Sequence, residues 1–228
     1  MGEMVTFPSN GNSCDGYLAV PEDGSGPDVI VIQEWWGLIG HITAVADRFA
    51  REGFVALAPD FFRGAKTAEP DDAMRLMMSL AMDNAAKDIS GAAQFLAERD
   101  DVTGSAIGTV GFCMGGSLAL WSATLAPNIV AAIGFYPAVP WDRMSPDWDG
   151  YQGKSAMIHC SEDDGTSAAP GIQTAWTAIT TAGGDVETFD YPGSHHAFFN
   201  DDRPEVYDAR HAEAAWQRTL GLLRCRLG

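Results

Sequence analysis

The sequence has few cysteines, and their spacing does not mark a cross-linked or zinc-binding protein. Four occur among 228 residues, at Cys14, Cys113, Cys160 and Cys225, and no two have C-x-x-C spacing. Small secreted domains that lack a large core use many disulfides, and structural zinc sites use closely spaced cysteines. We therefore expect free thiols, with neither a disulfide framework nor a metal site.

Basic residues and long apolar runs are also scarce. Lysine and arginine total 14 against 31 aspartates and glutamates, and the formal net charge is −17. Such a chain repels nucleic acids and anionic membrane surfaces, so neither is an expected partner. No stretch approaches the ~18 apolar residues of a membrane span, and residues 1–8 lack the pattern of a secretory signal. These absences predict a cytoplasmic protein.

Hydrophobic residues make up 46% of the chain, enough to bury the core of one ordinary domain. Short apolar runs alternate with longer amphipathic segments, which is typical of β-α-β units. We expect a single α/β domain over residues 1–228, with a mostly parallel sheet of about seven to eight strands and helices on both faces. The expected strands are Gly16–Val20, Val29–Gln33, Val55–Ala58, Ala106–Phe112, Ile129–Tyr136, Ser155–His159 and Val186–Tyr191. The expected helices are His41–Glu52, Pro70–Met82, Asn84–Arg99, Gly115–Leu125, Ala168–Ala182 and Pro204–Arg226.

The most informative segment runs from Gly111 to Gly115 and reads G-x-C-x-G. It follows the apolar run 106–110 and precedes a helix-like segment, which predicts a sharp strand-to-helix turn with Cys113 at its apex. Glycines two positions away on either side let the backbones approach closely around a strained nucleophile. The start of the helix favours the thiolate, the attacking species. Cys113 is therefore the candidate nucleophile.

Two later loops carry the residue types that would activate this thiol. After the expected strand at 155–159 comes Cys160-Ser161-Glu162-Asp163-Asp164-Gly165-Thr166. After the expected strand at 186–191 comes Pro192-Gly193-Ser194-His195-His196-Ala197-Phe198. The chain order of nucleophile, acid and histidine is that of the α/β hydrolases.

Five segments together resemble the dienelactone hydrolase family, whose members use cysteine, aspartate and histidine. The segments are Gln33-Glu34-Trp35-Trp36-Gly37, Ala58-Pro59-Asp60, Gly111–Gly116, Glu162–Thr166 and Gly193–Phe198. The resemblance implies the α/β hydrolase fold, hydrolysis of an ester or lactone in aromatic degradation, and no cofactor or metal. It implies a small unsaturated substrate that carries a carboxylate, and we expect a monomer or small homo-oligomer.

The resemblance also assigns the acid and the histidine. The family's G-x-x-D pattern places the acid at Asp164, with Asp163 as the second choice. The family's H-x-F pattern places the histidine at His196, followed by Phe198, ahead of His195.

The residues after the early apolar strand supply the other half of the expected chemistry. In this fold an oxyanion is held by the N–H after the nucleophile and an N–H after an early strand, here Met114 and Trp35. Glu34 ends that strand, where an ionised carboxylate is costly without a partner or a task. By resemblance its task is to interact with the thiol and set its protonation state. The alternative is an ion pair with Arg63 or Arg75.

Arginines are few, and the resemblance implies that one of them holds the substrate carboxylate. The candidates are Arg63, Arg75 and Arg203. Aromatic side chains suited to a flat conjugated substrate are Trp35, Trp36, Phe112, Tyr136 and Phe198. The predicted substrate-binding residues are Arg63, Trp36 and Phe198.

Other interpretations remain open. A general carboxylesterase or thioesterase would use the same machinery in a wider pocket. A non-catalytic binding or stress protein would share the fold, because fold does not determine function. The remaining histidines, His41, His159 and His211, have structural interpretations, with His41 near the oxyanion region. The methionines Met74, Met77, Met78 and Met82 have helical spacing and suit an adaptable core or a stripe that faces a lid.

Overall fold

The computed structural model describes residues 2–9 and 11–228, and its strands form one eight-stranded sheet in the order β1-β2-β4-β3-β5-β6-β7-β8. The strands are β1 (Glu3–Ser9), β2 (Asn12–Ala19), β3 (Gly26–Ile32), β4 (Val55–Pro59), β5 (Val102–Phe112), β6 (Ile129–Phe135), β7 (Ser155–Ser161) and β8 (Asp185–Tyr191). The helices are α1 (Gly40–Arg51), α2 (Pro70–Ser79), α3 (Met82–Ala97), α4 (Met114–Ser122), α5 (Pro170–Thr181) and α6 (Ala209–Leu227). Short 3₁₀ helices are η1 (Trp141–Arg143), η2 (Trp148–Tyr151) and η3 (Thr166–Ala168).

The sheet is mostly parallel, as the alternating pattern predicts. Strands β4, β3, β5, β6, β7 and β8 pair in parallel, whereas β2 joins β4 in an antiparallel pair and β1 joins β2 in another. The sequence analysis missed β1 and the first half of β2. These edge strands alternate between exposed and buried residues and so lack a continuous apolar run.

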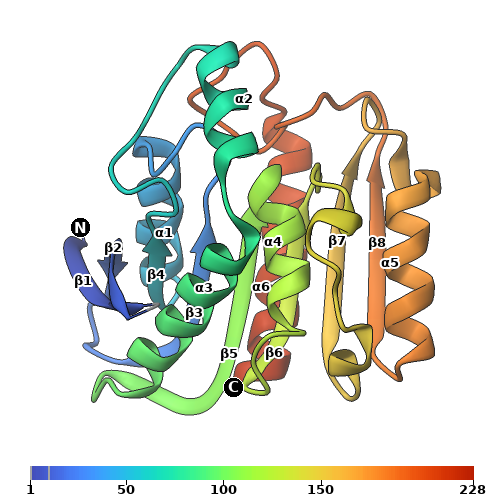
Figure 1. The fold of residues 1–228 in the computed structure, drawn as a ribbon. Coiled ribbons are helices and arrows are strands. Elements are labelled where there is room, and N and C mark those ends of the chain that lie inside the picture. The colour runs from blue at the N-terminus through green and yellow to red at the C-terminus, as the bar shows by residue number, and fades with distance from the viewer. Residues whose placement is uncertain (1, 10) are drawn as a thin grey trace.

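Helices cover both faces of the sheet, as expected (Figure 1). On one face, Val29 and Val31 of β3 belong to the same buried cluster as Val45 of α1. On the other face, Ile30 and Ile32 belong to a cluster with residues of α3, α4 and α5. Strands buried on both sides need apolar residues at successive positions, which explains the continuous apolar runs. In the described part of the chain, no helix is both long and apolar enough to cross a membrane.

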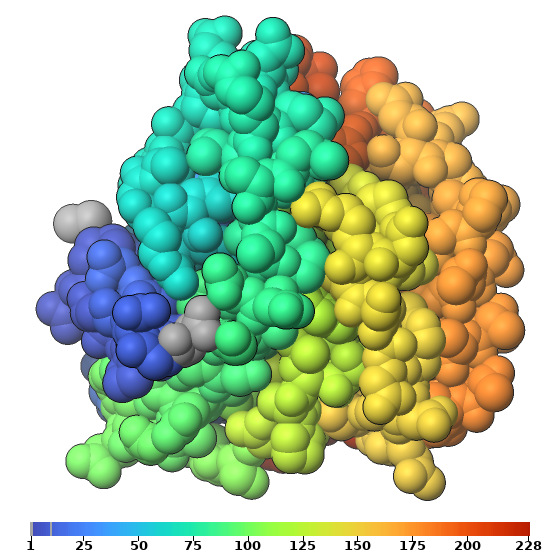
Figure 2. All heavy atoms as spheres, in the orientation of Figure 1, coloured from blue at the N-terminus to red at the C-terminus, as the bar shows by residue number. Residues whose placement is uncertain are grey.

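The helix α2 and the loop after β6 lie side by side on the face of the molecule that Figure 2 shows. Arg143 of η1 joins them, because its guanidinium donates to the carbonyl oxygens of Met77 at 3.5 Å and Leu80 at 3.3 Å. The segment 137–153 is anchored in part by Tyr151, which is fully buried.

The last helix begins later than the sequence analysis predicts. The expected start was Pro204, whereas α6 begins at Ala209. The side chain of Asp208 caps the helix by accepting a hydrogen bond from the His211 N–H at 2.9 Å. The residues before the cap form a turn that leads out of the candidate active site.

One carboxyl group is buried near the amino end of the central strands. Asp28 of β3 is 1% exposed, and neither of its carboxylate oxygens has a hydrogen-bond partner among the described residues. Burial raises the pKa of Asp28 to about 6. Because the charged form is disfavoured in the folded state, the folded protein holds this proton at pH values where the unfolded chain releases it.

We expect Asp28→Asn to become increasingly stabilising, relative to the wild type, as pH rises. The pKa of Asp28 is higher in the folded than in the unfolded chain, so its stabilising proton uptake is complete below about pH 4 and lost as pH rises through about 6. The full change in relative unfolding free energy is on the order of 3 kcal/mol. Urea unfolding at pH 4, 6 and 8 measures it, with the exposed Asp23→Asn as control. A stability difference independent of pH would contradict the assignment.

Candidate active site

Cys113 stands at the turn between β5 and α4. Its backbone has a φ of 54° and a ψ of −115°, in a region that side chains rarely adopt. A Cβ on Gly111 would collide with the Gly115 carbonyl, and a Cβ on Gly115 would collide with the Gln33 carbonyl. The Cys113 N–H donates to the Phe135 carbonyl at 3.0 Å and fixes the turn to β6. The glycines are therefore required by close contact between backbones.

His196 and Asp164 reach this turn from the loops after β8 and β7. The Nδ1 atom of His196 lies 2.8 Å from Oδ2 and 3.0 Å from Oδ1 of Asp164, and His196 lines the same cavity as Cys113. Burial by itself lowers the pKa of His196, but the influence of Asp164 and of the nearby Cys113 outweighs burial and raises the pKa to about 10. The hydroxyl of Ser161 donates to Asp164 and helps to hold it. The arrangement favours an imidazolium beside the sulfur.

A second histidine–aspartate pair lies next to the first but is turned to solvent. His195 Nδ1 is 2.9 Å from Asp163 Oδ2, and the two side chains are 58% and 55% exposed. The structure thus brings His196 and Asp164, rather than their neighbours, to Cys113.

Glu34 is buried at the end of β3. Its Oε2 accepts a hydrogen bond from Asn200 Nδ2 at 3.0 Å, and its Oε1 is buried with no partner among the described residues. Burial raises the pKa of Glu34 and outweighs the opposing influence of His41, of the Asn200 hydrogen bond and of other nearby charges. The carboxyl group therefore has a strong tendency to hold a proton.

Among the described residues, Glu34 does not form the ion pair with Arg63 or Arg75 that was its expected alternative. Arg75 pairs with Asp72 within α2, and Arg63 pairs with Asp88. Sequence reasoning missed Asn200 as the partner. A buried carboxylate needs a hydrogen-bond donor, and the only indication of one in the sequence was the asparagine that lies four residues after His196.

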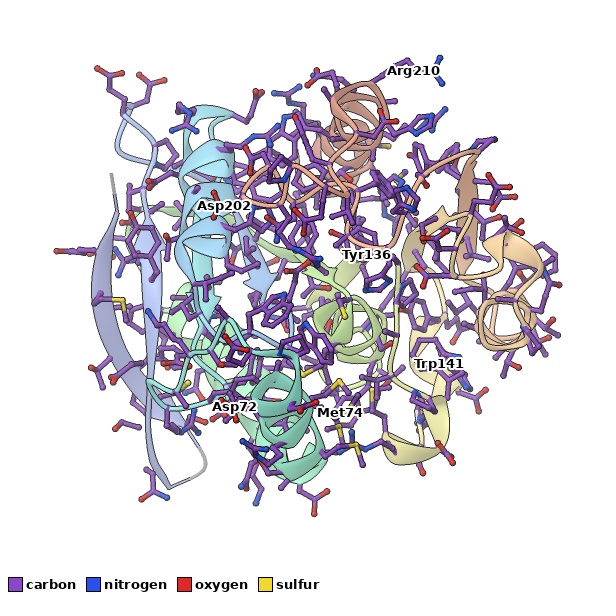
Figure 3. The ribbon with its side chains drawn as sticks, turned by 90° about the horizontal axis from the view of Figure 1, so that it is seen from above. Asp72, Met74, Tyr136, Trp141, Asp202 and Arg210 are labelled. Atoms are coloured by element: carbon purple, nitrogen blue, oxygen red, sulfur yellow. The ribbon has the colours of Figure 1, made fainter. Side chains whose placement is uncertain are left out.

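Tyr136 closes the site from the end of β6 and has a φ of 39°. Figure 3 views this edge of the sheet from above, and Tyr136 lies near the middle of the molecule. Its ring centre is 4.9 Å from that of His196, and its hydroxyl is buried without a partner among the described residues. Burial, with the charges of Glu34 and Cys113, raises the pKa of Tyr136 well above the ordinary value.

A cavity of about 290 Å³ opens beside Cys113. Its lining consists of Glu34, Trp35, Trp36, Met74, Met77, Cys113, Ala138, His196, Ala197 and Arg203. Two methionines of α2, Met74 and Met77, thus face the site. Phe198 does not line it, because its ring is packed at 5.5 Å from Tyr136 and 4.8 Å from Tyr191.

The structure does not bring Arg63 to this cavity. Its Nη2 atom lies 2.8 Å from both carboxylate oxygens of Asp88, and the pair lines a separate cavity of about 230 Å³. Arg203 does line the cavity beside Cys113, and its guanidinium carbon lies 5.8 Å from the centre of the Trp36 ring. Of the candidate arginines, Arg203 is therefore the one that lies beside Cys113, and its Nε donates to Glu205 at 2.9 Å.

The two expected oxyanion donors lie on either side of the turn. Met114 is the first residue of α4, so its N–H has no acceptor within that helix. Trp35 lies in the loop after β3 and lines the cavity. Both N–H groups belong to backbone that is fixed by the strand-to-helix packing.

His159 has a structural environment. His159 of β7 is buried between Tyr191 Oη at 2.8 Å and Thr219 Oγ1 at 3.1 Å, and burial lowers its pKa to about 3. Within residues 2–9 and 11–228, no three side chains of histidine, cysteine, aspartate or glutamate are arranged to hold a metal ion.

Comparison with known proteins places the chain among hydrolases. The family model for the dienelactone hydrolase family matches residues 14–227. Protein usf from Aquifex pyrophilus is 36% identical over 98% of both chains. A protein from Aquifex aeolicus, provisionally named a carboxymethylenebutenolidase, is 33% identical over the full length of both. The structure of a provisionally named dienelactone hydrolase from Klebsiella pneumoniae superposes with a TM-score of 0.84 at 24% identity, covering 98% of each chain, and shows the same fold.

We expect iodoacetamide to label Cys113 before the other thiols. Cys14 and Cys160 are 0% and 2% exposed, against 7% for Cys113, and burial raises the pKa of Cys14 and of Cys160 to about 12. Cys225 is exposed but has no helix N-terminus beside it. Mass-spectrometric mapping at increasing times gives the order, and Cys225→Ser removes the one exposed competitor. Labelling of Cys225 first, with activity retained after Cys113 has reacted, would remove Cys113 from the chemistry.

Proposed function

Because the chain belongs to the dienelactone hydrolase family and is a carboxylic ester hydrolase, we propose that it cleaves small esters or lactones with Cys113 as nucleophile. The observation that carries the proposal is the position of His196, which is hydrogen-bonded to Asp164 and lines the same cavity as Cys113 at its strained strand-to-helix turn. The parts have the mutual geometry of a nucleophile, a base and a residue that orients the base.

In the proposed reaction the Cys113 thiolate adds to the substrate carbonyl and forms a carbon–sulfur bond. The N–H groups of Trp35 and Met114 hold the oxyanion that develops. His196 donates its proton to the leaving oxygen as the carbon–oxygen bond breaks, which leaves a thioester. Water then attacks the thioester while His196 accepts a proton from it, and the Cys113 thiolate is released. Asp164 keeps the imidazole oriented through both steps.

Glu34 has a separate proposed role, which is to exchange a proton with the Cys113 thiol. Both residues line the same cavity, and the buried carboxyl group lies at the end of β3 beside the Trp35 N–H. A carboxylate here would oppose the oxyanion, whereas a protonated Glu34 would not. If Glu34 takes the thiol proton when substrate binds, the thiolate forms only when needed, and the resting sulfur is protected from oxidation.

The proposed substrate is small, flat and anionic. The cavity holds about 290 Å³, and Trp35 and Trp36 form an aromatic wall. Arg203 supplies positive charge beside that wall and suits a carboxylate. The names of relatives such as the Aquifex aeolicus protein support the carboxymethylenebutenolidase class of substrate.

Matched substitutions test the catalytic assignments. We expect His196→Ala and Asp164→Asn each to lower kcat by at least about a hundredfold, because members of a catalytic set act as a unit. The same changes at the exposed pair, His195→Ala and Asp163→Asn, should cost less than about threefold. Steady-state hydrolysis of an aryl ester and a dienelactone gives both comparisons. A reversed ranking within either pair would show that the wrong member had been assigned.

Replacement of Glu34 by Gln tests its role. The amide keeps the size and the hydrogen bond to Asn200 but cannot accept a proton, so kcat should fall by about tenfold or more. Circular dichroism and the thermal midpoint should change little. Wild-type kinetics for Glu34→Gln on the dienelactone and the aryl ester would leave Glu34 with a purely structural role.

A further inference from the structure

His41 is a buried histidine that the proposed reaction leaves unused. It is the second residue of α1 and is 1% exposed, and its Nδ1 lies 3.2 Å from Oδ1 of Asp201. Its ring lies edge-on to Phe112 and Phe199, with ring centres 6.1 and 6.3 Å away. The second ring nitrogen, Nε2, is buried and has no hydrogen-bond partner among the described residues.

Adjacent residues connect His41 with Glu34, because Asp201 contacts His41 and Asn200 donates to Glu34. Of the charged groups that favour the Glu34 carboxylate, His41 has the largest influence, ahead of His196 and Arg203. The Oε1 atom of Glu34 is also buried and without a partner in the described chain. An imidazole nitrogen and a carboxyl oxygen can share a proton through one bridging water molecule, whereas leaving each of them buried without a partner is unfavourable.

We infer that the histidine–aspartate pair of His41 and Asp201 takes the proton of Glu34 and so keeps Glu34 able to deprotonate Cys113. The inference rests on the proposed role of Glu34. His41 is a positioning residue in this proposal, because it controls where the proton of Glu34 lies and acts on the substrate only through Glu34.

The proposed proton transfers involve three side chains, those of Glu34, His41 and Cys113. With the proton on Glu34, the carboxylic acid cannot accept the thiol proton. Transfer breaks the Glu34 O–H bond and forms a His41 N–H bond, which leaves a carboxylate beside an imidazolium stabilised by Asp201. The carboxylate then takes the proton of Cys113 as its S–H bond breaks. After product release the same proton returns from Glu34 to sulfur, and His41 keeps its own.

The groups that act on Glu34 come from several elements. They are His41 from α1, Cys113 from the turn before α4, Tyr136 from the end of β6, and His196 and Arg203 from the loop after β8. His196 is already committed to Asp164 and Cys113. His41, whose Nε2 has no partner among the described residues, can therefore act as the base for Glu34.

The test compares His41→Gln, Asp201→Asn and the control Asp202→Asn. Glutamine can hydrogen-bond but holds no proton at neutral pH, so kcat/KM at pH 7 should fall about tenfold and its acid limb should move up by about one pH unit. KM for an activated aryl ester should stay nearly constant. Asp201, which is 56% exposed, should give a smaller shift in the same direction when replaced by Asn. Asp202→Asn removes the same charge from the neighbouring exposed position and should match the wild type.

The double variant Glu34→Gln/His41→Gln separates a proton role from a structural one. His41→Gln should add no loss in the Glu34→Gln background, because its target is gone. An equal loss in both backgrounds, or an unmoved acid limb, would overturn the inference. If His41→Gln folds poorly, the shift of the acid limb of kcat/KM in Asp201→Asn tests the inference instead. Activity in Cys113→Ala, or wild-type kinetics in Glu34→Gln, would overturn the proposed reaction and this inference together. An impaired Glu34→Gln with unchanged His41→Gln and Asp201→Asn would overturn this inference alone.

Discussion

The close contact of backbones around Cys113 is the constraint on which the rest of the site depends. Strand β5 can turn into α4 at this point only because Gly111, Gly115 and Gly116 leave no side chain between the helix and its neighbouring strands. The packing holds the cysteine in a backbone conformation that would otherwise cost about 1–3 kcal/mol. Every residue of α4 is buried, so the surrounding core resists relaxation of the turn. The positions of the sulfur and of the Met114 N–H follow from this packing.

Burial of Glu34 is the second determinant of the site. A carboxyl group at the end of an apolar strand lies among groups that titrate, and each of them changes the charge that the others feel. Asn200 donates a hydrogen bond to one oxygen of Glu34, and the other oxygen has no partner among the described residues and can carry a proton. The region around Glu34 is therefore electrostatically coupled, in contrast to the exposed His195–Asp163 pair, whose charges are screened by solvent.

The sequence predicted the parts of this protein that are written in local patterns. Continuous apolar runs located the parallel strands, and G-x-C-x-G located the turn, because each pattern follows directly from close packing. The edge strand β1 was missed because only alternate residues are buried. The partners Asn200 and Asp201 were missed because their contacts join loops to residues over a hundred positions away along the chain, which no local pattern records. The pairing of Arg63 with Asp88, 25 residues along the chain, depends on how α3 packs, and no local pattern around Arg63 indicates it.

The wall that α2 contributes to the cavity has a different character from the rest of the site. Only Ala73 of this helix is buried, and Arg143 connects its C-terminal end to the loop after β6. Its contribution to the cavity is made by methionines, whose unbranched side chains adjust to the shape of whatever lies against them. Exchange of residues on α2 would change the shape of the cavity while leaving Cys113 and its neighbours in place. Substrate range can therefore diverge within this fold faster than the catalytic geometry does.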